Sequence, residues 1–390
     1  MDSVSAKNLN QEAMKTFIKN PFLLPAFIVC LTFAPARAGQ YFQDFSPYPT
    51  GTTSLGDGSV LLSSLLGAVA SVQDATYKEL QLTTNGVSNV RSALLLPDLD
   101  PGTPIYAFSA KWNADVNGNF PNVADGFSFN FGQLNSLDLA GTGYSQEAGF
   151  GTGLSFGVQT YFGNNPGFYL RVNGTNVASV AYNASAQWGT NNLARHFFEV
   201  DWNYTNGMSV RMDGTNIFTN IATTNFTPHA GDCMVWAARC GTFTEEVRLD
   251  NIVVTTGGNL IQIPTSSPYY KSGEYTNANQ TADKAFDGNI ATKWLTLANT
   301  GYIGATVSPA ATVAAYAMTS GEDAPGRDPQ TWTVDGSNNG GTNWTSCASG
   351  SGYFFSRNET RAGLATIPAS FGAYRLNILA NNGDPYIQLA

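Results

Sequence analysis

The stretch Ala282-Asp-Lys-Ala-Phe-Asp-Gly-Asn-Ile-Ala-Thr-Lys-Trp294 decides how the C-terminal third of this chain is interpreted. An apolar Phe is followed by the turn Asp287-Gly288-Asn289, and then by a Thr and Trp294. Gly and Asn accept positive φ angles, so this order favours a loop that folds back on itself. Such a loop turns backbone carbonyls and one carboxylate inward, and calcium prefers these oxygen ligands. On spacing alone, a polar turn before a buried Trp explains the residues equally well.

The same residues resemble the A-x-D-G-x-x-x-T-x-W loop of the discoidin (coagulation-factor C-type) domains. That galactose-binding-like family includes many carbohydrate-binding modules, and in it this loop helps to hold a structural calcium ion. The resemblance therefore implies bound Ca²⁺, with metal ligands supplied by Lys284, Asp287, Asn289 and Thr292.

The discoidin resemblance extends over nearly all of residues 269–390. It continues through Tyr316–Trp332, Asp335–Gly340, Tyr374–Ile378 and Ile387–Ala390. The family pattern normally goes on with a Glu and one more strand. We therefore expect a jelly roll without its last strand, and a calcium site weakened by the loss of one ligand.

The composition indicates an extracellular β-rich protein with many turns. Of the 390 residues, 43% are hydrophobic but only 12% are charged, well below the usual quarter, and Gly is abundant. The net charge is −9 at pH 7, and no run of basic residues occurs. Nucleic acid and anionic membranes are therefore poor partners, because both need clustered Lys and Arg.

Residues 1–38 are typical of a signal peptide. Lys15 and Lys19 form a basic segment, an apolar run follows from Phe22 to Phe33, and Ala36-Arg37-Ala38 provides a small-x-small cleavage site. The apolar run is shorter than the ~20 residues that span a bilayer; a retained N-terminal anchor is the alternative. We expect a secreted protein with no membrane span once this segment is removed.

Residues 39–256 are predicted to form one large β domain. Short runs of alternating apolar and polar residues predict strands, separated by turn signals such as Asn117-Gly118 and Asn206-Gly207. Strands at this spacing indicate a sandwich or jelly roll. The expected strands are Ile105–Trp112, Gly126–Phe131, Leu154–Tyr161, Phe168–Val172, Phe197–Trp202, Met208–Met212, Cys233–Ala238 and Val247–Val254. An apolar stretch around Val60–Val72 is compatible with helix or strand.

Several strings in this part resemble the concanavalin A-like (legume-lectin-like) superfamily. Ala124-Asp125-Gly126 resembles the strand start whose Asp binds sugar hydroxyls in lectins, and Leu154–Tyr161, with Asn164 after it, resembles the metal-loop strand. The run from Phe226 to Val253 resembles the closing strands of bacterial relatives. The resemblance implies a carbohydrate site that includes Asp125, Gly126 and Asn164.

This chain departs from the lectins on the metal-loop strand. Lectins carry a Glu and an Asp there, where this chain has Gly157 and Gln159. Because Gly has no side-chain ligand and an amide is a poorer calcium ligand than a carboxylate, we expect the paired metal site to be absent. Asp125 is then either a sugar ligand or a structural turn residue that accepts hydrogen bonds from the backbone.

Residues 257–268 are predicted to be a linker, because glycines and prolines punctuate them. In the second domain, Glu322, Asp323 and Arg327 combine acceptors with a guanidinium and are candidate carbohydrate-binding residues. Internal Arg–Asp pairing that holds their loop in place is the structural alternative. Trp294 is expected in the core.

Two open alternatives concern catalysis and the cysteines. Glu199 and Asp201 alternate on one strand, and concanavalin A-like glucanases use a Glu-x-Asp-x-Glu strand with two catalytic glutamates. The third position here is Asn203, so glycoside hydrolysis is the less favoured hypothesis. Cys233 and Cys240 are either bridged or small buried residues.

We therefore predict an all-β protein of two β-sandwich (jelly-roll) domains in tandem, 39–256 and 269–390. Its predicted function is to bind extracellular or cell-surface polysaccharide. A structural or adhesive extracellular protein without a sugar site is the alternative. The sequence does not name the glycan or the oligomeric state.

Overall fold

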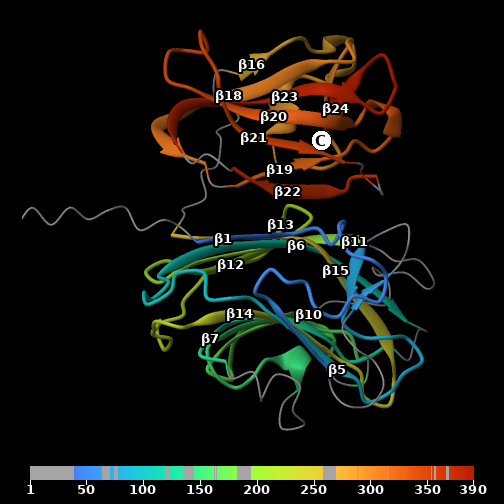
Figure 1. The fold of residues 1–390 in the computed structure, drawn as a ribbon, viewed down its shortest axis with the longest axis vertical. Coiled ribbons are helices and arrows are strands. Elements are labelled where there is room, and N and C mark those ends of the chain that lie inside the picture. Colours follow the sequence, from blue (N-terminus) through green and yellow to red (C-terminus); the bar gives the residue numbers. More distant parts are fainter. Residues whose placement is uncertain are drawn as a thin grey trace, which may run out of the picture. The chain divides into compact units, whose positions relative to one another are not determined.

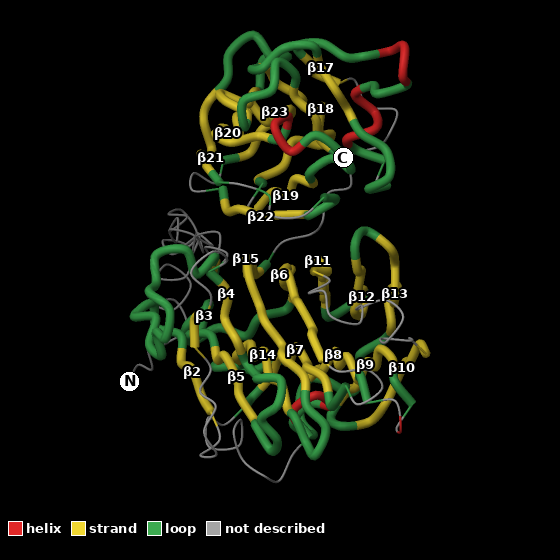
Figure 2. Tube along the Cα trace, turned by 90° about the vertical axis from the view of Figure 1, so that its right-hand side faces the viewer, coloured by secondary structure: helices red, strands yellow, loops and turns green. Residues whose placement is uncertain are grey.

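The computed structural model describes residues 39–63, 71–73, 78–118, 123–134, 145–161, 163, 165–181, 195–257, 269–287, 289–313, 315–352, 354, 357–365 and 369–390. The expected signal peptide, Asn164 and most of the expected linker lie outside these residues. The described chain is built of strands joined by turns, with a few short 3₁₀ helices (Figures 1 and 2). None of its helices is long and apolar enough to cross a membrane.

The N-terminal sandwich contains two antiparallel sheets. The first has the order β13-β12-β11-β6-β15-β4-β3, with β1 also pairing with β15, and the second has the order β10-β9-β8-β7-β14-β5-β2. Their strands are β1 (Gln40–Gln43), β2 (Val60–Ser63), β3 (Ser71–Gln73), β4 (Glu79–Gln81), β5 (Arg91–Leu95), β6 (Ala107–Gly118), β7 (Gly126–Gly132), β8 (Leu154–Gln159), β9 (Gly167–Val172), β10 (Thr175–Ala181), β11 (Arg195–Asn203), β12 (Gly207–Met212), β13 (Thr215–Ile221), β14 (Cys233–Arg239) and β15 (Glu245–Thr256). The helix η1 (Gln146–Ala148) precedes β8.

Aromatic side chains from both sheets fill the space between them. Trp112 of β6 stacks on Phe129 of β7 with ring centroids 5.5 Å apart, and on Phe198 of β11 at the same distance. All three side chains are fully buried. Since β6 and β11 belong to one sheet and β7 to the other, these contacts join the two layers seen in Figure 1.

Every strand predicted for the first domain is present, but β6 runs on to Gly118, six residues beyond the predicted end at Trp112, so Asn117-Gly118 lies in a strand and not in the expected turn. Three Asn-Gly and Asp-Gly signals are turns between paired strands: Asn173-Gly174 joins β9 to β10, Asn206-Gly207 joins β11 to β12, and Asp213-Gly214 joins β12 to β13. The ambiguous stretch around Val60–Val72 contributes two strands, β2 and the start of β3, in its described part.

The C-terminal sandwich packs one larger sheet against two strand pairs. The sheet has the order β16-β18-β23-β20-β21, and the pairs are β17-β24 and β19-β22. The elements are β16 (Tyr269–Lys271), η3 (Thr276–Ala278), η4 (Ala282–Ala285), β17 (Trp294–Thr296), β18 (Gly301–Thr312), β19 (Ala315–Thr319), η5 (Pro325–Arg327), β20 (Pro329–Ser337), β21 (Thr345–Ser351), β22 (Thr360–Leu364), β23 (Ser370–Asn381) and β24 (Ile387–Leu389).

Trp294 lies at the centre of this second core, as expected from the sequence. It is fully buried with Trp332, Ile378 and Ile387, and its indole Nε1 donates a hydrogen bond to the Gly273 carbonyl at 2.8 Å. Its strand β17 pairs with β24, so the segment that ends the motif is hydrogen-bonded to the last strand of the chain.

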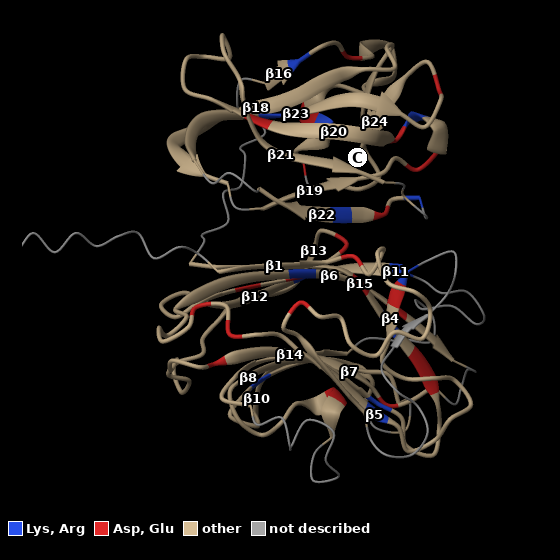
Figure 3. Cartoon of the chain, in the orientation of Figure 1, with Lys and Arg blue, Asp and Glu red and all other residues tan. Residues whose placement is uncertain are grey.

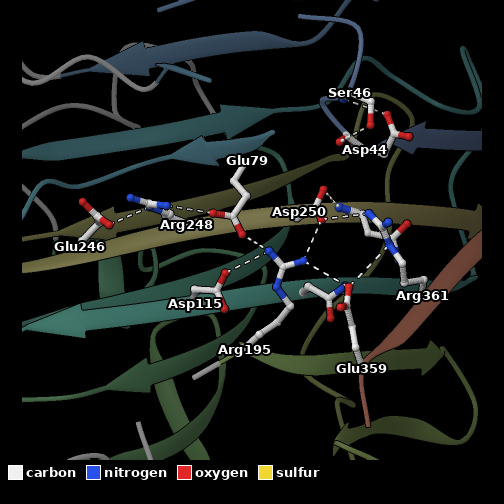
Figure 4. A network of polar contacts seen from close by, with 12 residues as sticks. Asp44, Ser46, Glu79, Asp115, Arg195, Glu246, Arg248, Asp250, Glu359 and Arg361 are labelled. Atoms are coloured by element: carbon white, nitrogen blue, oxygen red, sulfur yellow. Dashed lines mark hydrogen bonds and ion pairs between the residues drawn. The ribbon is translucent and has the colours of Figure 1, made fainter. Parts of the chain in front are cut away.

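An arginine with four carboxylate partners lies on β11. Arg195 is paired with Glu79 of β4, and lies 3.3 Å from Asp115 of β6, 3.0 Å from Asp250 of β15 and 3.3 Å from Glu359, which precedes β22 (Figure 4). The strand register places Arg195 directly opposite Asp115. All five side chains are at most 7% exposed.

This cluster contains fewer arginines than carboxylates. Arg248 and Arg361 bind the outer edges of the cluster, yet burial, Asp250 and Glu359 still raise the pKa of Asp115 to about 8. Asp115 is thus protonated below that pH. A protonated Asp115 leaves fewer negative charges for the arginines to balance.

The described cysteines form no disulfide. Cys233, Cys240 and Cys347 are free thiols, and burial raises the pKa of Cys240 to about 12. Of the two alternatives from the sequence, small buried residues is the one that the structure supports.

Candidate functional site

Asp125 is held by the backbone at the point where three strands meet. It directly precedes β7, its N–H donates to the carbonyl of Arg239 at 3.0 Å, and its carbonyl accepts from the N–H of Thr160 at 3.1 Å. Gly126 follows with φ +128°, and a Cβ there would lie 1.9 Å from the Val158 carbonyl oxygen. The Asp-Gly pair is therefore placed by close contact between β7 and β8, which only Gly allows.

The Asp125 carboxylate faces an arginine that is shared with a second carboxylate. Its Oδ2 lies 3.3 Å from Nη2 of Arg239, whose Nε and Nη2 donate to the two oxygens of Glu147, each at 2.8 Å. Oδ2 is buried and accepts no hydrogen bond within the described part of the chain. Burial raises the pKa of Asp125, although Arg239 opposes that shift.

Two aromatic residues follow the residues that contact Asp125. Tyr161 follows Thr160, whose N–H binds the Asp125 carbonyl, and its ring centroid is 5.6 Å from that of Phe243. Phe243 is an exposed large hydrophobic residue. It comes two residues after Gly241, where an added Cβ would be only 2.9 Å from Asp125 Oδ2. The segments that carry these two rings are therefore the ones that contact Asp125 through Thr160 and Gly241.

Of the residues predicted for this site, the structure brings Asp125 and Gly126 together, whereas Asn164 lies outside the described residues. Sequence reasoning did not predict Glu147, Arg239 or Phe243 as parts of the site. The signal for Arg239 was the strand register, because Arg239 of β14 lies opposite Gly126 of β7. Register depends on which strands pair, and periodicity alone does not reveal that.

The predicted residues of the second domain surround a buried lysine. Glu322 and Asp323 lie 2.9 Å and 2.6 Å from Nζ of Lys293, whose side chain is 3% exposed. Lys293 and burial act on Asp323 in opposite senses, and the net result is a lowered pKa. The two carboxylates are about half exposed, so they hold Lys293 from the solvent side.

Arg327 lies at the edge of the same loop. It is 3.5 Å from Asp384 and 3.7 Å from Asp323, and its guanidinium lies over the Tyr386 ring at 5.5 Å. The three predicted residues are therefore close together, and their charges are directed to partners within the domain. Among the described residues, charged side chains are sparse over most of the ribbon (Figure 3).

A second arginine, Arg357, lies outside this loop and holds it by hydrogen bonds and an ion pair. Arg357 pairs with the buried Asp328 and donates to the carbonyls of Gly321 and Asp323. The amide of Gln388, on β24, donates to Asp323 and Ala324 carbonyls. Internal Arg–Asp pairs, the structural alternative for this loop, are present: Arg357 pairs with Asp328, and Arg327 lies 3.7 Å from Asp323.

Three of the four predicted calcium ligands converge in the 282–294 loop. The Thr292 hydroxyl lies 2.8 Å from Asp287 Oδ2 and 2.9 Å from the Asn289 carbonyl oxygen, and the Asn289 N–H donates to Asp287 Oδ1. A carboxylate, a hydroxyl and a carbonyl fit the oxygen ligands that calcium takes. The Lys284 ammonium lies 3.9 Å from Asp287 and 3.2 Å from Asp283.

Glu199 and Asp201 are enclosed in an ion-pair network. Glu199 binds Lys111 at 2.7 Å and Arg211 at 2.9 Å, and Asp201 binds Arg211 at 2.9 Å. Although burial acts against it, pairing with Lys111 and Arg211 lowers the pKa of Glu199 to about 2. A glycosidase general acid needs a raised pKa, so Glu199 has the opposite electrostatics.

No family model matches the chain, and no curated protein matches it. Among solved structures, one similar to this chain is the family 32 carbohydrate-binding module of C. perfringens NanJ, in complex with galactose. It is 21% identical; the match covers 33% of this chain and 93% of that module, with a TM-score of 0.28. The Emp47p carbohydrate recognition domain is 14% identical and covers 57% of this chain and 99% of its own, with a TM-score of 0.41.

Lectin I from Ulex europaeus, in complex with the methyl glycoside of α-L-fucose, is 15% identical to this chain. The match covers 56% of this chain and 98% of the lectin, with a TM-score of 0.42. The similar structures thus come from the discoidin-like carbohydrate-binding modules and the lectin-like recognition domains that the sequence resembles. The likeness concerns the fold.

Proposed function

We propose that this chain is a secreted carbohydrate-binding protein and that its N-terminal sandwich binds sugar at Asp125. One observation carries the proposal: the buried Asp125 Oδ2 has Nη2 of Arg239 as its ion-pair partner at 3.3 Å but accepts no well-formed hydrogen bond in the described chain, and Phe243, two residues after Gly241, is exposed. A buried acceptor with only a long ion-pair contact can still gain a closer donor. A sugar hydroxyl supplies such a donor, and the apolar face of a sugar ring suits an aromatic ring.

The chemistry of the site favours a neutral glycan. The Arg239 guanidinium already faces the carboxylates of Asp125 and Glu147, so its charge is engaged and does not attract a further anionic group. The net charge of −9 acts in the same direction. Extracellular or cell-surface polysaccharide with unsubstituted hydroxyls is therefore the proposed ligand class. Export rests on the signal-like residues 1–38.

Replacing Asp125 with Asn tests the proposed site. We expect about 10-fold or greater loss of affinity for the best glycan of a broad panel, because a hydrogen bond to a charged group contributes roughly 1.5–3 kcal/mol. Affinity is measured by isothermal titration calorimetry on the full chain after glycan-array screening.

Asp201→Asn is the matched control, since Asp201 is also an arginine-paired carboxylate, with 17% side-chain exposure against 15% for Asp125. We expect it to retain affinity within about 2-fold, as a residue outside the site. Equal affinities for Asp125→Asn and the wild type would show that the sugar-binding site lies elsewhere. Absence of binding to every glycan on the panel would favour the structural or adhesive alternative.

We further propose that the C-terminal sandwich takes a structural calcium ion. The Asp287 carboxylate, the Asn289 carbonyl and the Thr292 hydroxyl would hold it, and Lys284 is implicated by the discoidin resemblance alone. A bound ion would link η4 to the start of β17 and so stabilise the loop that carries Trp294.

Calcium is expected to raise the melting temperature of the C-terminal domain. At a free calcium concentration of 100 Kd the stabilisation is about 2.7 kcal/mol, which corresponds to a shift on the order of 10 °C. Differential scanning calorimetry in calcium and in chelator measures it, and Asp287→Ala should remove the difference. Identical melting curves of the wild type in both conditions would refute the calcium site.

A further inference from the structure

The residues at the position of the lectin metal site do not fit a metal ion. Gly157 of β8 supplies no side chain, and a Cβ built on it would lie 2.5 Å from the Glu147 carbonyl oxygen and 3.1 Å from Nη1 of Arg171. Any larger residue there would collide with a backbone carbonyl. The described residues also contain no group of three or more His, Cys, Asp or Glu side chains arranged to hold a metal ion.

A guanidinium lies instead between the carboxylates of Glu147 and Asp125. Arg239 makes a bidentate pair with Glu147, at 2.8 Å for both bonds, and its Nη2 also lies 3.3 Å from Asp125 Oδ2. A planar guanidinium in this geometry has fixed orientation as well as fixed charge. Its position is further set by the main chain, because the Arg239 carbonyl accepts the Asp125 N–H.

We propose that Arg239 is a built-in cation that positions Asp125 for sugar binding, so that the site works without a metal ion. The inference rests on the proposed carbohydrate-binding function of Asp125. Glu147 is a positioning residue in this arrangement. It accepts hydrogen bonds from Nε and Nη2 of Arg239, and this orients the guanidinium so that Nη2 also faces Asp125. The remaining acceptor capacity of Asp125 Oδ2 is then available to a hydroxyl donor.

The charges around Asp125 come from several elements. Glu147 lies on η1, Arg239 and Cys240 at the end of β14, Glu245 on β15, Arg91 on β5 and Arg171 on β9. Burial raises the pKa of Glu245 to about 8, which favours its neutral form, and Thr160 donates to it at 2.6 Å. Asp125 and Glu147 are then the carboxylates that Arg239 must balance.

The first test is metal dependence. We expect the affinity of the wild type for its best glycan to change by less than about 2-fold in excess EDTA. The same titration in Asp287→Ala separates the two domains, because the proposed calcium loop is removed in that variant. Glycan binding by Asp287→Ala that EDTA abolishes would overturn the inference and leave the proposed function intact.

The second test removes the guanidinium. Arg239→Met retains much of the side-chain volume, and we expect at least 10-fold weaker glycan binding, with partial recovery in Arg239→Lys because an ammonium cannot pair bidentately with Glu147. Arg375→Met is the matched control: Arg375 also binds a carboxylate, with 19% side-chain exposure against 22% for Arg239. Unchanged affinity in Arg239→Met, with wild-type binding present, would overturn the inference.

The third test does not depend on finding a glycan. The carboxyl carbon of Asp125 is followed by NMR in protein labelled with ¹³C at Asp side chains, and Asp125→Asn assigns its signal. Loss of the nearby cation in Arg239→Met should raise the pKa of Asp125 relative to the wild type. A pKa that stays the same would show that Arg239 does not act on Asp125, whatever the chain binds. A folded variant is verified by its circular dichroism spectrum.

Discussion

Replacing Arg195 with Met is expected to lower the free energy of unfolding by about 3–5 kcal/mol, because it leaves buried carboxylates without their shared cation. Glu79, Asp115, Asp250 and Glu359 all contact this guanidinium, and each is at most 4% exposed. Arg248 and Arg361 remain, but they lie at the edges of the cluster (Figure 4). Met fills much of the volume without replacing the charge.

Urea denaturation followed by far-UV circular dichroism measures this change. Lys271→Met is the control, since Lys271 also pairs with a carboxylate but is 39% exposed; an exposed pair contributes at most about 1 kcal/mol. Because protonation removes negative charge from the cluster, the loss in Arg195→Met should be smaller at pH 5 than at pH 9. A loss below about 1 kcal/mol at pH 9 would show that the cluster relaxes or admits water.

Replacing Trp294 with Ala is expected to destabilise the C-terminal sandwich by about 3–5 kcal/mol. The indole is fully buried, its Nε1 donates to the Gly273 carbonyl, and it packs with Trp332 and Ile387 in the core. Truncation leaves a cavity and an acceptor without its donor. The same strand, β17, pairs with β24, so the loss spreads to the last strand of the chain.

Differential scanning calorimetry locates the affected transition. Trp294→Phe should cost less than Trp294→Ala because it retains part of the ring volume, and Leu297→Ala, at a 58% exposed side chain three residues further on, should change stability by less than about 0.5 kcal/mol. An unchanged melting temperature in Trp294→Ala would mean that the motif Trp is dispensable for this core.

Alternation and turn chemistry predicted eight strands of the first domain, but not β1, β4, β5, β10 or β13. Val247–Val254 and Phe197–Trp202 appear as parts of β15 and β11, and Asn206-Gly207 joins two strands as expected. These signals are local: a strand shows its buried face every second residue, and Asn-Gly accepts the φ angles of a tight turn. The edge strands β10 and β13 were missed because they are largely exposed and lack that alternation. The strands β1, β4 and β5 were missed because they have five residues or fewer, too few to show a period.

Only the Asp125-Gly126 part of the candidate site could be predicted from the sequence, because there neighbouring residues by themselves mark the turn. Asp125-Gly126 was identified from its string, and the structure shows why Gly is required there. Arg239 and Glu147 are 114 and 22 residues from Asp125 in the chain, and nothing in their neighbours marks them as its partners. Likewise, Lys293 precedes the motif Trp without any sign that it binds Glu322 and Asp323.

Local patterns in this sequence thus specify an all-β chain, its hairpins, the buried Trp294 and the Asp125-Gly126 turn. Each follows from the conformations and burial preferences of neighbouring residues. Strand pairing decided the rest: it placed Arg195 opposite Asp115 and Arg239 opposite Gly126. Charges that are distant in sequence become partners only when register brings them within a few ångströms inside a desolvated interior, where Coulomb attraction is strong enough to set their protonation and geometry.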